Sequence, residues 1–126
     1  MPLVRIDLIS GKPVDYRLVI GEVVYRAMTD IINVPAHDRF QVIAEHSKEN
    51  FIYDKTYLGI SRTDDCVFIQ VTLNEGRSVE LKQQFYAFIA NELHEKIGIG
   101  REDILINLIE VAKENWSFGN GEAQYV

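Results

Sequence analysis

The sequence contains one cysteine, Cys66, among its 126 residues. A single cysteine excludes an internal disulfide and is typical of a reducing compartment, so we expect a cytoplasmic protein. No apolar run approaches the roughly 20 residues that a membrane-spanning helix needs, and we expect no membrane partner. Charged residues also interrupt segment 1–7, where a secretory signal peptide would have its apolar stretch.

Positive charge is scarce as well. The 13 Lys and Arg residues against 19 Asp and Glu residues leave a net charge of −6. Such a surface repels a phosphate backbone, and no local basic patch offsets it, so we expect no nucleic-acid partner. Apolar residues make up 47% of the chain and charged residues 25%, a balance that allows a buried core and argues against disorder.

Several kinds of site have no signature in the sequence. The three histidines, His37, His46 and His94, lack metal-ligand spacing, and Cys66 adds no cluster to them. There is no Gly-x-Ser-x-Gly motif or dinucleotide fingerprint, and segment 119–121 is not followed by a helix that would make it a phosphate loop. We therefore expect neither a metal nor a cofactor, and we interpret Cys66 as a buried structural thiol.

An internal repeat organises the chain. The two halves align without a gap when Gly11 is placed on Gly76. In this alignment segment 11–17 falls on 76–82 with its small, basic, apolar and acidic positions matched, and Asp38 falls on Asp103. We interpret the chain as one domain, 1–126, with pseudo-repeats 2–45 and 67–111 joined by segment 46–66.

Each repeat has the pattern of a strand, a helix and a second strand. Apolar residues alternate in the strands and recur at helical spacing in the helices, while glycines and prolines separate the elements. The predicted strands are 3–8, 40–44, 67–73 and 104–111, and the predicted helices are 14–32 and 79–96. Because 67–73 is almost wholly apolar or β-branched, we expect it to be buried on both faces.

These elements predict an α/β (α+β) fold, in which two β-α-β units form a four-stranded sheet with two helices on one face. The other face would then be uncovered in a single chain. An apolar sheet face is seldom left exposed, so we expect the chain to form oligomers. Segment 46–66 is a long polar connection that contains Tyr57, and loops of this length are usually functional.

Four segments carry a resemblance to a known family. They are Met1-Pro2, the motif Pro35-Ala36-His37-Asp38-Arg39-Phe40-Gln41, the turn Gly76-Arg77-Ser78, and the late segment Trp116-Ser117-Phe118-Gly119-Asn120-Gly121. Together with the doubled unit they resemble the tautomerase superfamily, most closely its malonate semialdehyde decarboxylase group. The resemblance implies a homotrimer and a catalytic proline that is exposed when the initiator methionine is removed.

Pro2 is the first candidate catalytic residue. Removal of Met1 would leave a secondary amine, and burial in an apolar pocket would lower its pKa from the usual value near 8. Such an amine can take up and return a proton, or polarise a carbonyl when protonated. The alternative is that Pro2 merely begins an edge strand, where its missing N–H does no harm.

Arg77 is the candidate for binding a carboxylate. It stands at a strand-to-helix turn, where a helix N-terminus and a guanidinium can hold an anion together. The alternative is a solvated arginine, since Lys12 occupies the matching position of the first repeat. The decarboxylases of the group carry two arginines spaced by one residue here, whereas this chain has Asn74, Glu75 and Gly76 before Arg77.

The resemblance also assigns Asp38 a place near the proline, where it would position substrate or water. The alternative is turn chemistry, because Asp103 occupies the matching position of the second repeat. Trp116 and Phe118 are expected to form an apolar wall that excludes water, or to pack a seam between subunits. Tyr57 and His37 are further candidates for the pocket.

These residues support two hypotheses. The first is a cofactor-independent enzyme that acts on a small oxo acid by keto–enol tautomerisation or by decarboxylation of the malonate semialdehyde type. Arg77 would anchor the carboxylate, and Pro2 would move the proton or polarise the carbonyl. The alternative is a non-catalytic binding or signalling protein on the same fold, since a fold alone does not define a function.

Overall fold

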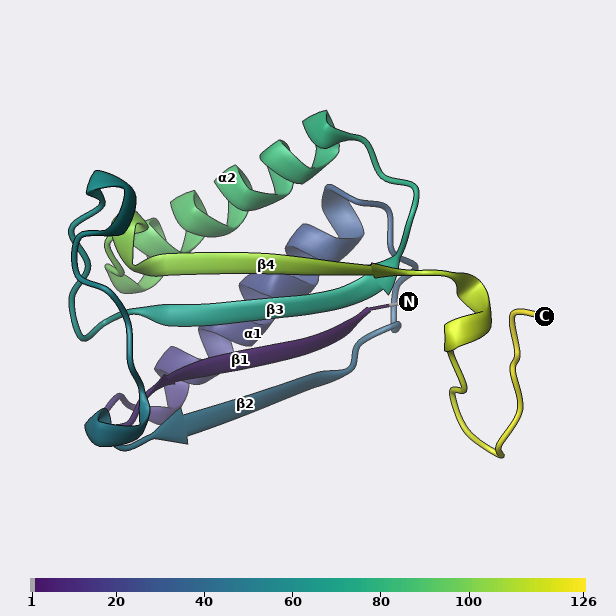
Figure 1. The fold of residues 1–126 in the computed structure, drawn as a ribbon, viewed down its shortest axis with the longest axis horizontal. Coiled ribbons are helices and arrows are strands. Elements are labelled where there is room, and N and C mark those ends of the chain that lie inside the picture. The colour runs from purple at the N-terminus through teal and green to yellow at the C-terminus, as the bar shows by residue number, and fades with distance from the viewer. Residues whose placement is uncertain (1) are drawn as a thin grey trace.

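The computed structural model describes residues 2–126 as one four-stranded sheet with two helices against one of its faces. The strand order is β2-β1-β3-β4, and Figure 1 looks onto the face that the helices do not cover. This confirms the predicted fold class. The removal of Met1, predicted from the resemblance, concerns a residue outside the described part of the chain.

The first unit contains β1 (Leu3–Ile9), α1 (Val14–Asp30) and β2 (Gln41–His46). Pro13 stands at the N-cap of α1, where a fixed backbone and a missing N–H cost nothing. The helix ends at Asp30, short of the predicted end at Ile32, and the chain turns at Asn33 with a positive φ of 61°.

The second unit contains β3 (Val67–Asn74), α2 (Val79–Ile97) and β4 (Ile104–Val111). Ser78 caps α2, since its hydroxyl oxygen accepts a hydrogen bond from the N–H of Leu81 at 3.2 Å. Gly98 ends the helix in the left-handed conformation, with φ of 71°, which glycine adopts without steric cost.

Strand pairing joins the two units through their first strands. Within each unit the strands are parallel, as a helical crossover requires, and β1 and β3 pair antiparallel at the centre. The register places Leu3 opposite Thr72. The beginning of β1 therefore lies beside the end of β3.

The core lies between the sheet and the helices. Alternate residues of β1 and β3 and the inner stripe of each helix are fully buried there. They include Val4, Ile6, Leu8, Ile69, Val71, Leu73, Ile20, Val23, Val24, Ala27, Phe85, Ile89 and Leu93.

The expectation that segment 67–73 is buried on both faces was wrong for the single chain. Val67, Ile69 and Val71 are buried against the helices, whereas the intervening Phe68 and Gln70 point to the face that no helix covers. The apolar residues of β3 therefore lie on two faces, one buried in the core and one that remains accessible to solvent.

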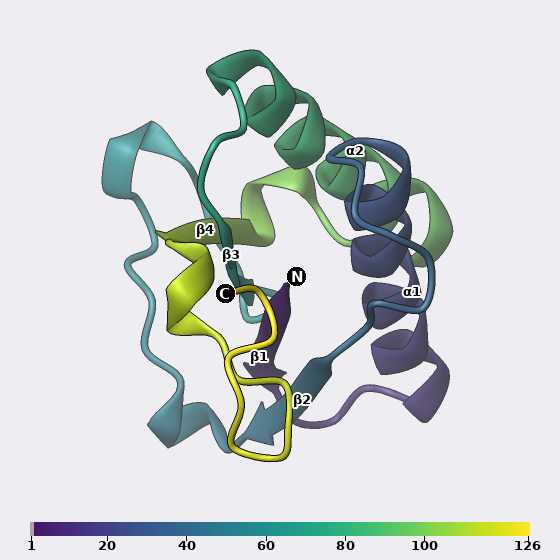
Figure 2. The ribbon, with the colours of Figure 1, turned by 90° about the vertical axis from the view of Figure 1, so that its right-hand side faces the viewer.

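The uncovered face carries apolar side chains that solvent reaches. Leu3, Val42, Leu105 and Ile109 are all exposed there. The connection between the units, 47–66, projects beyond this face in Figure 2, on the side away from both helices. An exposed apolar sheet face of this kind is typical of a surface that contacts another chain.

The two halves repeat their backbone geometry at the positions that the sequence repeat matches. These positions include the starts of α1 and α2 at Val14 and Val79, the positive φ values at Gly11 and Gly76, those at Asn33 and Gly98, and the 3-10 helices Lys48–Asn50 and Lys113–Asn115. We infer from these matches that the chain is a duplicated unit, with pseudo-repeats 2–45 and 67–111.

The buried stripe of α2 makes a stability prediction. Leu93 is 0% exposed, so Leu93→Ala is expected to lower the free energy of unfolding by about 2–5 kcal/mol. Leu18 is 60% exposed on α1, and Leu18→Ala is expected to change it by less than about 0.5 kcal/mol. Urea unfolding at one protein concentration measures both, and equal losses would contradict the core assignment.

Candidate active site

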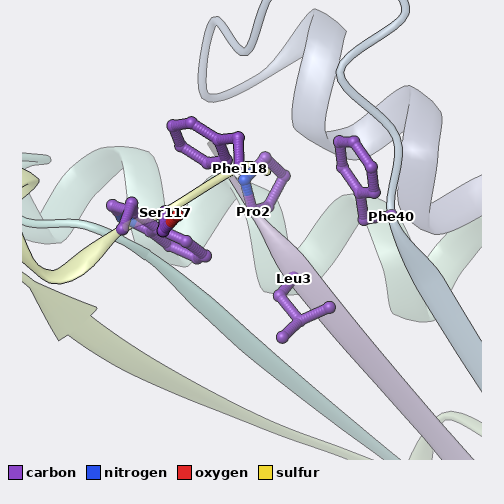
Figure 3. A pocket seen from close by; sticks show the side chains of 6 residues that line it. Pro2, Leu3, Phe40, Ser117 and Phe118 are labelled. Atoms are coloured by element: carbon purple, nitrogen blue, oxygen red, sulfur yellow. The ribbon is translucent and has the colours of Figure 1, made fainter. Parts of the chain in front are cut away.

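A pocket of about 200 Å³ opens at the beginning of β1. It is mainly apolar and is lined by Pro2, Leu3, Phe40, Trp116, Ser117 and Phe118. Figure 3 shows Pro2 beside Phe118, with Phe40 facing it from the other side. Pro2 itself is buried.

The strands bring two parts of this pocket together. The backbone N–H of Val4 donates to the carbonyl of Phe40 at 3.0 Å, which holds the residue before β2 beside the beginning of β1. Phe40 is 51% exposed, and its ring stands at the pocket without being packed into the core. Leu3 belongs to the uncovered face, so the pocket opens at the end of that face.

The segment after β4 supplies an aromatic wall of the pocket. The rings of Trp116 and Phe118 stack with centroids 5.5 Å apart and an interplanar angle of 18°. Tyr125 meets Phe118 edge-on at 5.0 Å. Gln124 closes this segment on itself: its side-chain oxygen accepts from the N–H of Phe118 at 2.9 Å, and its amide donates to the carbonyl of Gly119 at 2.8 Å.

The indole of Trp116 is also tied to the sheet. Its Nε1–H donates to Oδ1 of Asn74, the last residue of β3, at 2.8 Å. Trp116 and Phe118 both line the pocket with Pro2. The sequence left open whether they also pack between subunits.

Arg77 is held at the turn between β3 and α2. Its guanidinium donates to the carbonyl of Ile32 at 3.3 Å, from both Nε and Nη2, and to the carbonyl of Asn74 at 2.9 Å from Nη1. Three of its five N–H groups are thus used on backbone carbonyls. Arg77 does not line the Pro2 pocket within residues 2–126, but it shares Asn74 with Trp116.

The turn that carries Arg77 is itself anchored. Glu110 of β4 accepts a hydrogen bond from the N–H of Gly76 at 3.3 Å and another from Lys82 at 2.5 Å. The hydrogen bond from Lys82 is the main cause that lowers the pKa of Glu110, and the positive charge of Arg77 acts in the same direction. The carboxylate therefore stays ionised and holds the turn in place.

Asp38 and Asp103 occupy matching places at the entrances to β2 and β4. Asp38 is half-buried, and its N–H donates to the carbonyl of Pro35 at 3.3 Å. Asp103 is 2% exposed and accepts from the N–H and the hydroxyl of Thr63, both at 2.6 Å. Asp103 of the second unit is thus a structural residue. Asp38 of the first unit lies two residues before Phe40, which lines the pocket.

Two further candidates lie apart from this pocket. Tyr57 is 64% exposed and lines a separate depression on the uncovered face, together with Arg62 and Phe68. The N–H of His37 donates to the hydroxyl of Tyr25 at 3.1 Å, and His37 does not line the pocket within the described chain. A single chain therefore does not bring Tyr57 or His37 to Pro2.

Cys66 is buried, as predicted. Burial, with a smaller contribution from the charge of Asp103, raises the pKa of its thiol to about 11, so it is not a thiolate near neutral pH. Residues 2–126 contain no cluster of three or more His, Cys, Asp or Glu that would hold a metal ion. No helix within the same residues is long and apolar enough to cross a membrane.

Sequence reasoning missed Leu3, Phe40 and Ser117 as pocket residues and Asn74 as a partner of the wall. The sequence contains one signal for the position of Trp116. Lys-Glu-Asn followed by an aromatic residue occurs at 48–51 and again at 113–116, which extends the repeat past residue 111. That match indicates that Trp116 follows β4 as Phe51 follows β2.

Known proteins similar to this chain show its family. Residues 38–119 match the tautomerase enzyme family, and a second tautomerase family matches residues 2–59. The chain is 40% identical over 126 residues to the probable tautomerase YusQ of Bacillus subtilis and covers 99% of that protein. The chain therefore belongs to the tautomerase family.

Two solved structures are similar to nearly the whole chain. FG41 malonate semialdehyde decarboxylase, inhibited by 3-bromopropiolate, has 37% sequence identity and a TM-score of 0.90, with 98% of this chain and 93% of that chain aligned. Another malonate semialdehyde decarboxylase, described with decarboxylase and hydratase activities, has 31% identity and a TM-score of 0.89 over 98% and 95%. The closeness to malonate semialdehyde decarboxylases agrees with the resemblance drawn from the sequence motifs.

Proposed function

We propose that the chain is a cofactor-independent enzyme that uses Pro2 as an amino-terminal proline and acts on a small oxo acid. The reaction is keto–enol tautomerisation or decarboxylation of the malonate semialdehyde type. The observation that carries the proposal is the burial of Pro2 in an apolar pocket whose walls are Phe40, Trp116 and Phe118. The likeness to tautomerases and malonate semialdehyde decarboxylases supports it.

The chemistry depends on the amine that removal of Met1 would expose. An apolar pocket disfavours the charged form of an amine, and a neutral secondary amine near physiological pH can act as a base. For tautomerisation it would move a proton between the carbon next to the carbonyl and the oxygen: from carbon to oxygen when the enol forms, and from the enol oxygen to carbon when the keto form is made. For decarboxylation the protonated amine would stabilise the enolate that remains after CO2 leaves.

Arg77 would bind the carboxylate of the oxo acid. Its two N–H groups beyond the three bonds to carbonyls are the donors for this contact, and those three bonds orient the guanidinium in advance. The pairing of β1 with β3 supports the assignment, because it brings the turn after β3 to the end of the sheet where Pro2 lies.

Asp38 would act beside the amine. It precedes Phe40 by two residues, and the carbonyl of Phe40 accepts a hydrogen bond from the N–H of Val4, two residues after Pro2. A carboxylate there would favour the protonated form of the amine, or would orient a water molecule or the substrate. Asp38 and the apolar walls thus act on the pKa of Pro2 in opposite directions, and their balance selects between the two reactions.

The pocket would be completed in a homotrimer. It opens at the end of the uncovered face, where Leu3 is shared between the pocket and the exposed apolar surface. A neighbouring copy on this face would bury the remaining apolar side chains and shield the pocket from water. Tyr57, which lies away from Pro2 in its own chain, would then face another subunit.

The first experiment is intact-mass spectrometry of the purified protein, followed by turnover assays with phenylenolpyruvate and malonate semialdehyde. We expect a mass without methionine and turnover of one of the substrates, because only a free amine can carry the proton. Pro2→Ala keeps a free amino terminus but loses the secondary amine, and it is expected to lower kcat at least about 10²-fold. Retained methionine with no turnover would instead favour a binding or signalling role.

Substitution of Arg77 tests the anchor. Arg77→Ala is expected to lower kcat/KM at least about tenfold for an oxo acid, in keeping with the loss of a charged hydrogen bond. Lys12→Ala is the matched control, because Lys12 holds the corresponding position of the first unit and is paired with Asp65 at 2.6 Å. Equal kinetics for the wild type and Arg77→Ala would remove Arg77 from the site.

Light scattering at micromolar concentration tests the assembly. We expect about three times the chain mass of 14.5 kDa. Ile109→Glu places a charge on the uncovered face and is expected to shift the protein towards the monomer, whereas Leu18→Glu on the outer side of α1 is expected to leave the mass unchanged. A monomeric wild type would overturn the trimer.

A further inference from the structure

Asn74 links two components of the site that are far apart in the chain. Its side-chain Oδ1 accepts the indole N–H of Trp116 at 2.8 Å, and its backbone carbonyl accepts Nη1–H of Arg77 at 2.9 Å. Within residues 2–126, Asn74 is the one residue that hydrogen-bonds to both side chains. The wall of the pocket and the guanidinium thus share one support.

The place of Asn74 on β3 explains how its side chain reaches the wall. Leu73 is buried against the helices, so Asn74, the next residue, points to the uncovered face, where the segment after β4 passes. An indole nitrogen is a donor only, and a half-buried donor needs an acceptor. The amide oxygen of Asn74 meets that need for Trp116.

The other half of the chain lacks this hydrogen bond. In the alignment of the two halves, Phe51 corresponds to Trp116 and Ile9 to Asn74. Phe51 is held by stacking on Phe68, with ring centroids 4.4 Å apart. The position that matches Phe68 in the first unit is Leu3, which lines the pocket together with Trp116.

The two ends of the sheet hold their aromatic residues in different ways. The end of the sheet without an amino-terminal proline fixes its aromatic residue by packing, whereas the end with Pro2 uses a side-chain hydrogen bond and leaves a cavity beside the ring. A hydrogen bond holds a ring at a set angle without filling the space in front of it. That space is where a substrate would lie.

We infer that Asn74 is a positioning residue: it holds the indole of Trp116 as a wall of the Pro2 pocket and so determines which substrates fit against it. Asn74 acts through Trp116 and does not itself react. The effect on substrates rests on the proposed function, whereas the effect on the indole does not. Because the carbonyl that receives Arg77 belongs to the backbone, a side-chain substitution at Asn74 tests the wall alone.

The fluorescence of Trp116 gives a readout that is independent of activity, since the chain has a single tryptophan. Asn74→Leu removes the acceptor, and we expect acrylamide to quench its emission at least twofold more efficiently than in the wild type. Asn74→Asp retains an acceptor oxygen and is expected to restore the wild-type quenching. Asn74→Ala replaces Asn74→Leu if circular dichroism shows that the leucine variant is misfolded.

Gln70→Leu is the matched control. Gln70 is an amide on the same strand and the same face, and its side chain donates to Asn107 at 3.2 Å, away from the wall. It is expected to leave the quenching of Trp116 unchanged. Unchanged quenching in Asn74→Leu, or an equal rise in Gln70→Leu, would overturn the inference.

A double-mutant cycle tests the consequence for the substrate. Asn74→Leu is expected to lower kcat/KM about fivefold to tenfold in the wild type, as expected for loss of one hydrogen bond, and to have little effect in a Trp116→Phe background. The same loss in both backgrounds would show that Asn74 does not act through Trp116. If the wild type turns over no oxo acid, the proposed function fails, and the quenching still decides whether Asn74 holds the indole.

Discussion

The antiparallel pairing of β1 with β3 is the contact on which the rest of the structure depends. It is the junction between two units that are otherwise each complete as strand, helix and parallel strand. Because the two strands run in opposite directions, the beginning of β1 meets the end of β3. Pro2 from one unit is thereby placed at the same end of the sheet as Asn74 and Arg77 from the other, and the site belongs to neither unit alone.

The same pairing creates a second, related end of the sheet, where the covalent structure of the chain excludes a free amine. The alignment of the two halves places Val67, Asp103 and Lys12 where the first end has Pro2, Asp38 and Arg77. The nitrogen of Val67 lies inside the chain as an amide, so no free amine can form there. That end is instead closed by its own loop, through the bonds of Asp103 to Thr63 and of Lys12 to Asp65.

The uncovered face joins fold and site. Two crossovers on one side of the sheet leave its other side uncovered in the single chain (Figures 1 and 2). The pocket opens at one end of that uncovered side. Burial of the face in the proposed trimer would therefore also exclude water from the pocket. An amine whose protonation depends on its surroundings would respond to that burial directly.

The elements and the chemical groups could be predicted from the sequence. Helical spacing in 14–32 and 79–96, the turn at Gly98 and the internal repeat are local or periodic signals. Pro2, Arg77 and the aromatic pair at 116–118 were singled out by the motifs that resemble the tautomerase superfamily. Which of these groups meet depends on the three-dimensional arrangement. In that arrangement Trp116 is hydrogen-bonded to Asn74, and Arg77 to the carbonyl of Ile32. Phe40 lines the pocket, and Tyr57 lies outside it. The reason is physical: strand order and register bring together residues that lie far apart in the chain, and neither leaves a periodic trace in the residues that it joins.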